Sequence, residues 1–205
     1  MLEKEVNPYG LNFKIESKAK TKESAIKSAF LKGSTEKHLL LFYSDNEFIN
    51  IIAPGELIKI KLETDVNPPG FANYENKYRM VPIPYAIRFY NEPSLFAGKL
   101  HAVICRSWKN RVKGKDWYDY IFYLTRKSQF NLLHLQARLI DSSYLDADEQ
   151  LNLDNVKTIL NERFDKIDFN QVKQDALPFI KNPQALNIWS LEFFKAITND
   201  LKDNN

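Results

Sequence analysis

The sequence predicts an α+β protein, with a strand-rich first part and a helical second part. Before residue 91, several segments alternate apolar and polar residues, which is typical of half-buried strands. From residue 91 onward, apolar residues instead recur at steps of three and four, as they do on one face of a helix. With 205 residues and 44% hydrophobic content, the chain can bury a substantial core.

The first ninety residues are expected to form mainly strands joined by turns. The alternation and the β-rich apolar runs predict strands over residues 11–15, 38–43, 57–65 and 87–90. A short helix is expected over residues 22–32, where lysine and alanine are frequent. Pro54-Gly55 and Asn67-Pro-Pro-Gly70 are turn sequences.

The clearest alternation lies in residues 57–65. Lys61, Glu63 and Asp65 fall on its polar face, because side chains along a strand alternate with period two. Glu63 and Asp65 are two residues apart, roughly 7 Å at the usual strand rise, so they can share a divalent cation such as Mg²⁺. The alternative is a solvated face on which Lys61 pairs with its acidic neighbours.

Helices are expected throughout the second part. Asn91 is suited to cap the first of them, because Glu92 and Pro93 follow in its first turn. This helix should run to about residue 106, and a second should begin near residue 115 and continue to residue 124. Further helices are expected over residues 131–140, 153–167, 169–179 and 183–201, which together predict a small bundle.

The stretch from residue 106 to residue 115 is strongly basic. Five of its ten residues are Lys or Arg and none is acidic, a density that attracts phosphate. The candidate phosphate-binding residues are Lys99, Arg106, Arg111, Lys113 and Lys115. Lys99 shares a predicted helix face with Arg106 inside an otherwise apolar pattern; lysine neutralises phosphate as a point charge, whereas arginine binds it bidentately. The alternative is a wet loop with ordinary surface charges.

Asp116 and Asp119 stand three residues apart, on one face of the second predicted helix. Asp116 is suited to orient a basic neighbour, to contribute to a metal site or to contact a ligand, and Asp119 is suited to brace it. The alternative is helix capping. Trp117, Tyr118 and Phe122 are expected in the core rather than stacked on bases.

Composition narrows the class of protein. Residues 1–140 carry 22 basic and 14 acidic side chains, whereas residues 141–205 carry 7 and 12, which favours a polyanionic partner for the first part. The single cysteine, Cys105, cannot form an internal disulfide. Neither a membrane-spanning apolar run nor a signal peptide is recognisable, and phosphate-binding glycine loops are missing. A cytoplasmic protein is expected.

Taken in order, three segments resemble a known family. They are the strand that ends in Glu63-Thr-Asp65, the helix from Leu95 to Arg106 that contains Lys99, and the segment Arg111-Val-Lys113-Gly-Lys115-Asp116-Trp-Tyr-Asp119. Their order resembles the AbiEii/AbiGii toxin family of nucleotidyltransferases, which belongs to the polymerase-β-like superfamily. The resemblance extends from about residue 10 to the C-terminal helices.

This resemblance implies a nucleotidyltransferase-like mixed sheet with flanking helices over residues 1–125, followed by a helical bundle over residues 126–205. It implies an enzyme that transfers a nucleotide from an NTP with Mg²⁺, acts on RNA such as tRNA, and has a cognate antitoxin. By position, Lys99 matches the lysine that binds nucleotide phosphate. Asp116 matches the acidic end of the basic-Lys-Asp motif, and Glu63, with Asp65, lies on the strand that supplies a catalytic acid.

The chain departs from the family pattern in one respect. The family's first motif, a Gly-Ser turn followed by an Asp-x-Asp or Asp-x-Glu pair, is expected to precede the first residue of this sequence. Gly33-Ser34 with Asp45-x-Glu47 is interpreted as a coincidental match. Two main functions therefore stay open: an NTP-binding nucleotidyltransferase that modifies RNA, and a degenerate, non-catalytic nucleotide- or RNA-binding scaffold that needs a missing upstream-encoded segment or a partner. A third possibility is a purely structural interaction module that binds neither nucleotide nor RNA.

Overall fold

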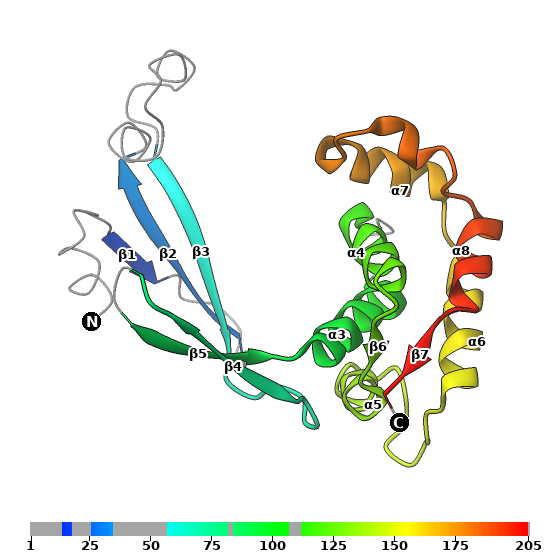
Figure 1. Ribbon diagram of the computed structural model, residues 1–205, viewed down its shortest axis with the longest axis horizontal. Helices are drawn as coiled ribbons and strands as arrows, with labels where there is room; N and C mark the ends of the chain where they lie inside the picture. The colour runs from blue at the N-terminus through cyan, green and yellow to red at the C-terminus, as the bar shows by residue number, and fades with distance from the viewer. Residues whose placement is uncertain (1–13, 18–25, 35–56, 82–83, 107–111, 205) are drawn as a thin grey trace. The chain divides into compact units, whose positions relative to one another are not determined.

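The computed structural model describes residues 14–17, 26–34, 57–81, 84–106 and 112–204 (Figure 1). The chain forms two compact units, residues 1–68 and residues 69–205. The described residues of the first unit form mainly strands and those of the second mainly helices, so the predicted α+β class is confirmed. The boundary expected near residue 125 falls inside the second unit, at the end of a helix.

The described part of the first unit is a three-stranded antiparallel sheet in the order β1-β2-β3. Its strands are β1 (Lys14–Ser17), β2 (Ile26–Ser34) and β3 (Leu57–Asp65). The strand predicted over residues 57–65 is therefore confirmed. The helix predicted over residues 22–32 is wrong where the structure describes it, because β2 is the central strand and pairs on both sides, which overrides its helix-forming composition. The strand predicted over residues 38–43 lies outside the described residues.

The second unit opens with an antiparallel hairpin of β4 (Tyr74–Arg79) and β5 (Tyr85–Tyr90). β5 agrees with the strand predicted over residues 87–90, whereas β4 was not predicted. Figure 1 shows β5 leading directly into the first helix of this unit. Residues of the hairpin are mostly exposed, and only Phe89 and Tyr90 at its helix end are partly buried.

All the described α-helices of the second unit except α4 begin at a side-chain cap. Asn91 accepts a hydrogen bond from the Ser94 N–H at 3.1 Å, and Asn131, Asn152, Asp168 and Ser190 cap later helices. The helices are α3 (Glu92–Cys105), α4 (Gly114–Thr125), α5 (Leu132–Asp141), α6 (Leu153–Phe164), α7 (Phe169–Ala176) and α8 (Leu191–Thr198).

The C-terminal part contains shorter elements than the sequence predicted. The helix expected over residues 169–179 ends at Ala176 and continues as a 3₁₀ turn (Leu177–Phe179), because Pro178 has no N–H to donate. The helix expected over residues 183–201 divides into a 3₁₀ turn (Pro183–Leu186) and α8. Two short strands, β6 (Gln129–Phe130) and β7 (Lys202–Asp203), form a parallel pair that was not predicted.

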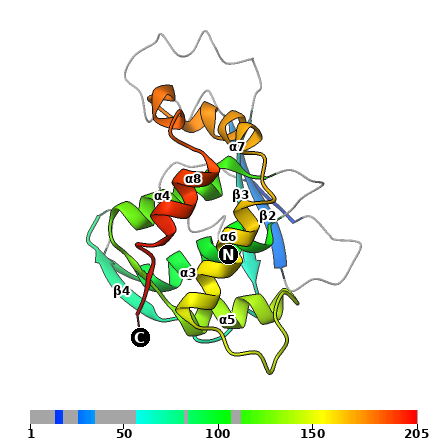
Figure 2. The ribbon, with the colours of Figure 1, turned by 90° about the vertical axis from the view of Figure 1, so that its right-hand side faces the viewer.

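An aromatic cluster joins α4 to the C-terminal helices. The ring centroid of Trp117 lies 5.0 Å from that of Phe194 and 5.4 Å from that of Phe164. α6 and α8 pack together beside it (Figure 2). The prediction that Trp117 is a core residue is confirmed, but Tyr118 and Phe122 are 47% and 45% exposed, because they project from the opposite side of α4.

Candidate functional site

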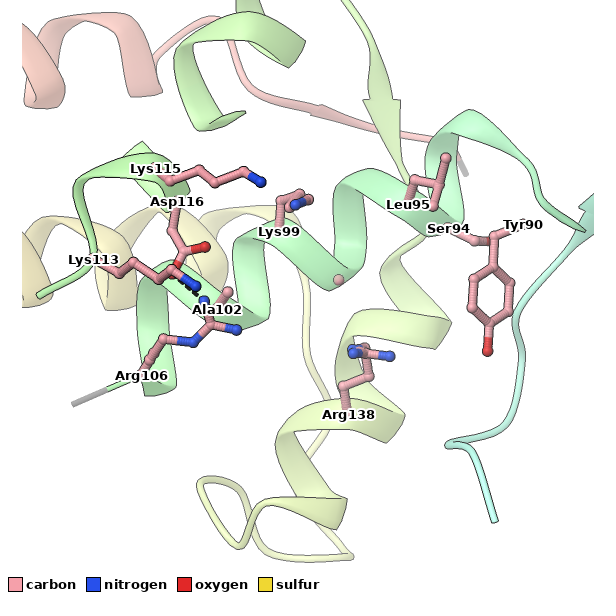
Figure 3. A pocket seen from close by; sticks show the side chains of 11 residues that line it. Tyr90, Ser94, Leu95, Lys99, Ala102, Arg106, Lys113, Lys115, Asp116 and Arg138 are labelled. Atoms are coloured by element: carbon pink, nitrogen blue, oxygen red, sulfur yellow. Dashed lines mark hydrogen bonds and ion pairs between the residues drawn. The ribbon is translucent and has the colours of Figure 1, made fainter. Parts of the chain in front are cut away.

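A pocket of about 350 Å³ lies over α3 and the first turn of α4 (Figure 3). That volume is in the range of small-ligand sites. The residues that line it are Tyr90, Ser94, Leu95, Gly98, Lys99, Ala102, Arg106, Lys113, Lys115, Asp116 and Arg138. Five of these side chains are basic and one is acidic, so the pocket favours an anionic ligand.

Two ion pairs between α3 and α4 set the position of the cations from α3. The Nζ of Lys99 lies 2.6 Å from the Oδ2 of Asp119, and the Nη1 of Arg106 lies 2.5 Å from the Oδ2 of Asp116. The Asp116 side chain is only 7% exposed, whereas Arg106 is 46% exposed. A buried carboxylate requires a charged partner, and Asp116 therefore fixes Arg106 at the pocket wall.

The first turn of α4 is held by α7. Lys113, the N-cap residue, makes no capping hydrogen bond through its side chain. Instead, the Oδ2 of Asp175 accepts a hydrogen bond from the Gly114 N–H at 2.8 Å. A Cβ at Gly114 would lie 2.5 Å from the nitrogen of Ala176, so only glycine allows this approach. The contact fixes the turn that carries Lys113, Lys115 and Asp116.

The C-terminal end of α3 is held by α6. The Nη2 of Arg163 donates to the carbonyl oxygen of Arg106 at 2.9 Å, and its Nε donates to that of Val103 at 3.3 Å. These bonds satisfy carbonyl groups that a helix end leaves without intrahelical partners. The backbone of Arg106 is therefore anchored independently of its side chain.

Arg138 of α5 is a pocket residue that the sequence interpretation missed. Its Cζ lies 3.7 Å from where a Cβ at Gly98 would stand, so the guanidinium passes close to α3. Its Nε is buried and has no hydrogen-bond partner among the described residues. No local spacing links Arg138 to Lys99, because the packing of α5 on α3 brings them to one pocket.

The family model for the nucleotidyl transferase AbiEii toxin of type IV toxin–antitoxin systems matches residues 7–196. This range includes most of each unit and every residue of the pocket. The chain belongs to the AbiEii family. No curated protein and no solved structure gives a match. The resemblance found in the sequence is thus confirmed, and AbiEii membership implies nucleotide substrates and an antitoxin partner.

The structure brings together most of the predicted site residues of the second unit. Lys99, Arg106, Lys113, Lys115 and Asp116 all line the pocket. In Figure 3, Arg106, Lys113 and Asp116 gather at one end, Tyr90 lies at the other, and Lys99 lies between them. Asp119 reaches the same wall through its ion pair with Lys99. Arg111 lies outside the described residues.

The remaining predicted site residues belong to the first unit. Lys61 and Glu63 lie on β3, and their side chains are outside the described part of the chain. Asp65 is exposed, and its Oδ1 accepts a hydrogen bond from the Asn67 N–H at 3.0 Å. These acids belong to the first unit, whereas the pocket belongs to the second.

AbiEii nucleotidyltransferases generally use a divalent metal. Among the residues that the structure describes, no group of three or more His, Cys, Asp or Glu side chains can hold a metal ion. Asp116 and Asp119 are each engaged by a basic side chain. The described residues of the second unit therefore do not fit a Mg²⁺ site by themselves. No helix in the described ranges is both long enough and apolar enough to span a bilayer.

His101 lies near the arginines of the pocket and has a lowered pKa in the folded protein. Burial, together with the nearby Arg138 and Arg106, lowers its pKa from 6.5 to about 4, against an opposing effect of Asp141. Its Nε2 lies 3.1 Å from the Oγ of Ser142. A neutral imidazole is therefore maintained in the folded protein at pH values where the unfolded chain binds a proton.

We expect His101→Gln to flatten the pH dependence of stability. The wild-type protein should lose stability as the pH falls from about 6.5 towards 4, because protons then bind the unfolded state preferentially. His101 is partly exposed, so we expect its contribution between pH 7.5 and pH 5 to be about 1 kcal/mol after allowance for solvent screening. Urea unfolding at both pH values checks this. Identical pH dependence in the two proteins would contradict it.

Proposed function

We propose that this AbiEii protein binds the triphosphate of an NTP in the pocket over α3 and transfers a nucleotide to an RNA such as tRNA. The observation that supports it best is the convergence of five basic side chains, from α3, α5 and the start of α4, on one pocket of ligand size. A triphosphate is the common metabolite group whose charge and length suit such a lining.

The basic residues have different parts in this proposal. Lys99 acts as a point charge at the middle of the pocket, while Arg106 offers its outer guanidinium donors, because Asp116 occupies its Nη1. Arg138 approaches from the opposite helix with an unsatisfied Nε. Lys113 and Lys115 stand on the turn that Gly114 fixes. Together they stabilise the negative charge that develops on the departing pyrophosphate.

The reaction is a substitution at the α-phosphorus. An RNA hydroxyl gives its proton to a carboxylate or to water, its oxygen forms a bond to that phosphorus, the bond to the bridging oxygen breaks, and pyrophosphate leaves with the electron pair. Glu63 and Asp65 of β3 stay the proposed Mg²⁺ ligands and catalytic acids, because hard cations prefer carboxylate oxygens. Asp116, predicted as a further catalytic acid, contributes by holding Arg106.

One observation favours a second candidate function. Both carboxylates of α4 that the sequence placed at the site are neutralised by cations from α3. A pocket of this kind binds phosphate without needing catalytic acids of its own. The second candidate is thus a non-catalytic nucleotide- or RNA-binding scaffold whose chemistry depends on another segment or partner.

Incubation of the full chain with an α-labelled NTP, Mg²⁺ and total tRNA tests the proposal. We expect label in the RNA fraction, and its loss in Arg106→Ala and in Glu63→Gln. NTP binding without label transfer would support the scaffold instead. Absence of both NTP binding and transfer would overturn the assignment of the pocket.

A further inference from the structure

The two faces of the β4–β5 hairpin differ in chemistry. The register pairs Tyr74 with Tyr90, Asn76 with Arg88 and Tyr78 with Ala86. Because paired residues point to the same side of a sheet, these six form one face, here called the aromatic face. The opposite face consists of Glu75, Lys77, Arg79, Tyr85, Ile87 and Phe89. Only the opposite face carries a carboxylate.

The aromatic face presents the rings of three tyrosines and the guanidinium of Arg88. The rings of Tyr74 and Tyr90 lie 4.9 Å apart between centroids, and the Cζ of Arg88 lies 4.4 Å from the Tyr74 centroid. In the register, Arg88 is diagonal to both Tyr74 and Tyr78. Tyr74 is 45% exposed and Tyr78 is 74% exposed. Flat exposed rings alternating with arginine are typical of surfaces on which nucleic-acid bases stack.

The opposite face carries two cations, Lys77 and Arg79, together with the carboxylate of Glu75. The Nζ of Lys77 lies 3.3 Å from the Oε1 of Glu75 and 4.7 Å from the ring centroid of Phe89. Glu75 would also repel a phosphate backbone on that side. The aromatic face presents Arg88 and no carboxylate, so a phosphate backbone on that side meets a cation without a like charge beside it.

The aromatic face ends at the pocket. Tyr90, its last residue, also lines the pocket beside Ser94 and Leu95 (Figure 3). Tyr74 and Tyr78 are four residues apart along β4, about 13 Å at the usual rise. A short single-stranded segment lying on this face would lead its terminal nucleotide to the pocket.

We propose that the aromatic face binds the single-stranded end of an RNA, with bases stacked on Tyr74 and Tyr78 and with Arg88 between them. Aromatic stacking is tolerant of sequence, whereas a duplex buries the faces of its bases, so the site selects single strands. The role of this RNA as the acceptor rests on the proposed function. Its binding to the hairpin does not.

Fluorescence anisotropy with the full chain and a labelled single-stranded RNA tests this proposal. We expect the double variant Tyr78→Ala/Arg88→Ala to bind about tenfold more weakly or worse, from the loss of one stacking platform and one cation. The matched control is Tyr85→Ala/Arg79→Ala, which removes one exposed tyrosine and one arginine from the opposite face. We expect its affinity to change by less than about twofold.

Further measurements separate stacking from general charge. Tyr78→Phe should bind as the wild type does, because the ring suffices for stacking, and a duplex of the same sequence should bind more weakly than the single strand. Equal losses in the two double variants, or equal affinity for single strand and duplex, would overturn the proposal. NTP affinity, measured on the same proteins, should stay unchanged. If NTP does not bind while the RNA difference persists, the pocket assignment fails and the aromatic face stands.

Discussion

Replacing Gly114 with alanine should destabilise the second unit by about 3 kcal/mol, the upper range for an overpacked site. The added Cβ would stand 2.5 Å from the Ala176 nitrogen and from the Val172 oxygen. Both atoms belong to the backbone of α7, so no side chain can move aside. The two helices must separate, which would also weaken the bond between Asp175 and the Gly114 N–H.

Chemical denaturation followed by circular dichroism measures this effect, and Gly70→Ala is the matched control. A Cβ at Gly70 meets nothing within 4 Å, so we expect a change below about 0.5 kcal/mol. Equal stability of the two variants would show that α4 does not depend on its close approach to α7.

Replacing Lys99 with methionine should weaken NTP binding by roughly tenfold to a hundredfold, the worth of a charge-assisted contact in a partly desolvated pocket. Methionine keeps the length of the side chain and removes its charge. The variant also leaves the carboxylate of Asp119, 19% exposed, without Lys99, which adds repulsion towards phosphate. Lys99→Met/Asp119→Asn should therefore recover part of the affinity.

Titration of a fluorescent NTP measures this series. Lys166→Met, at an exposed position outside the pocket lining, removes the same charge and should leave the affinity within about twofold. Arg138→Gln should give an intermediate loss, because one of several cations is removed. Equal losses for Lys99→Met and Lys166→Met would indicate a general effect of net charge.

Local patterns in the sequence predicted the features that depend on neighbouring residues. The alternation of residues 57–65 identified β3, and Asn91 with Pro93 identified the start of α3. The helical spacing of Lys99 and Arg106 also placed them on one side, and the structure puts both at the pocket. These features could be predicted from the sequence because each depends on residues that lie close together along the chain.

Features that depend on distant contacts were missed or mispredicted. The composition of residues 22–32 favoured a helix, but pairing with strands on both sides makes residues 26–34 a strand. Arg138 was not among the predicted site residues, and Asp175, which caps α4, lies 61 residues from Gly114 in the sequence. Such contacts arise from helix packing, which a single sequence does not encode locally.

The central claim is that the pocket over α3 recognises a triphosphate. Calorimetric titration of the full chain with an NTP, the corresponding nucleoside monophosphate and inorganic triphosphate, each with Mg²⁺, tests it most directly. We predict that inorganic triphosphate competes with the NTP and that the monophosphate binds at least about tenfold more weakly, since it offers fewer phosphates to the five cations that line the pocket. Equal affinity for the monophosphate and the NTP, or no competition by inorganic triphosphate, would contradict the claim.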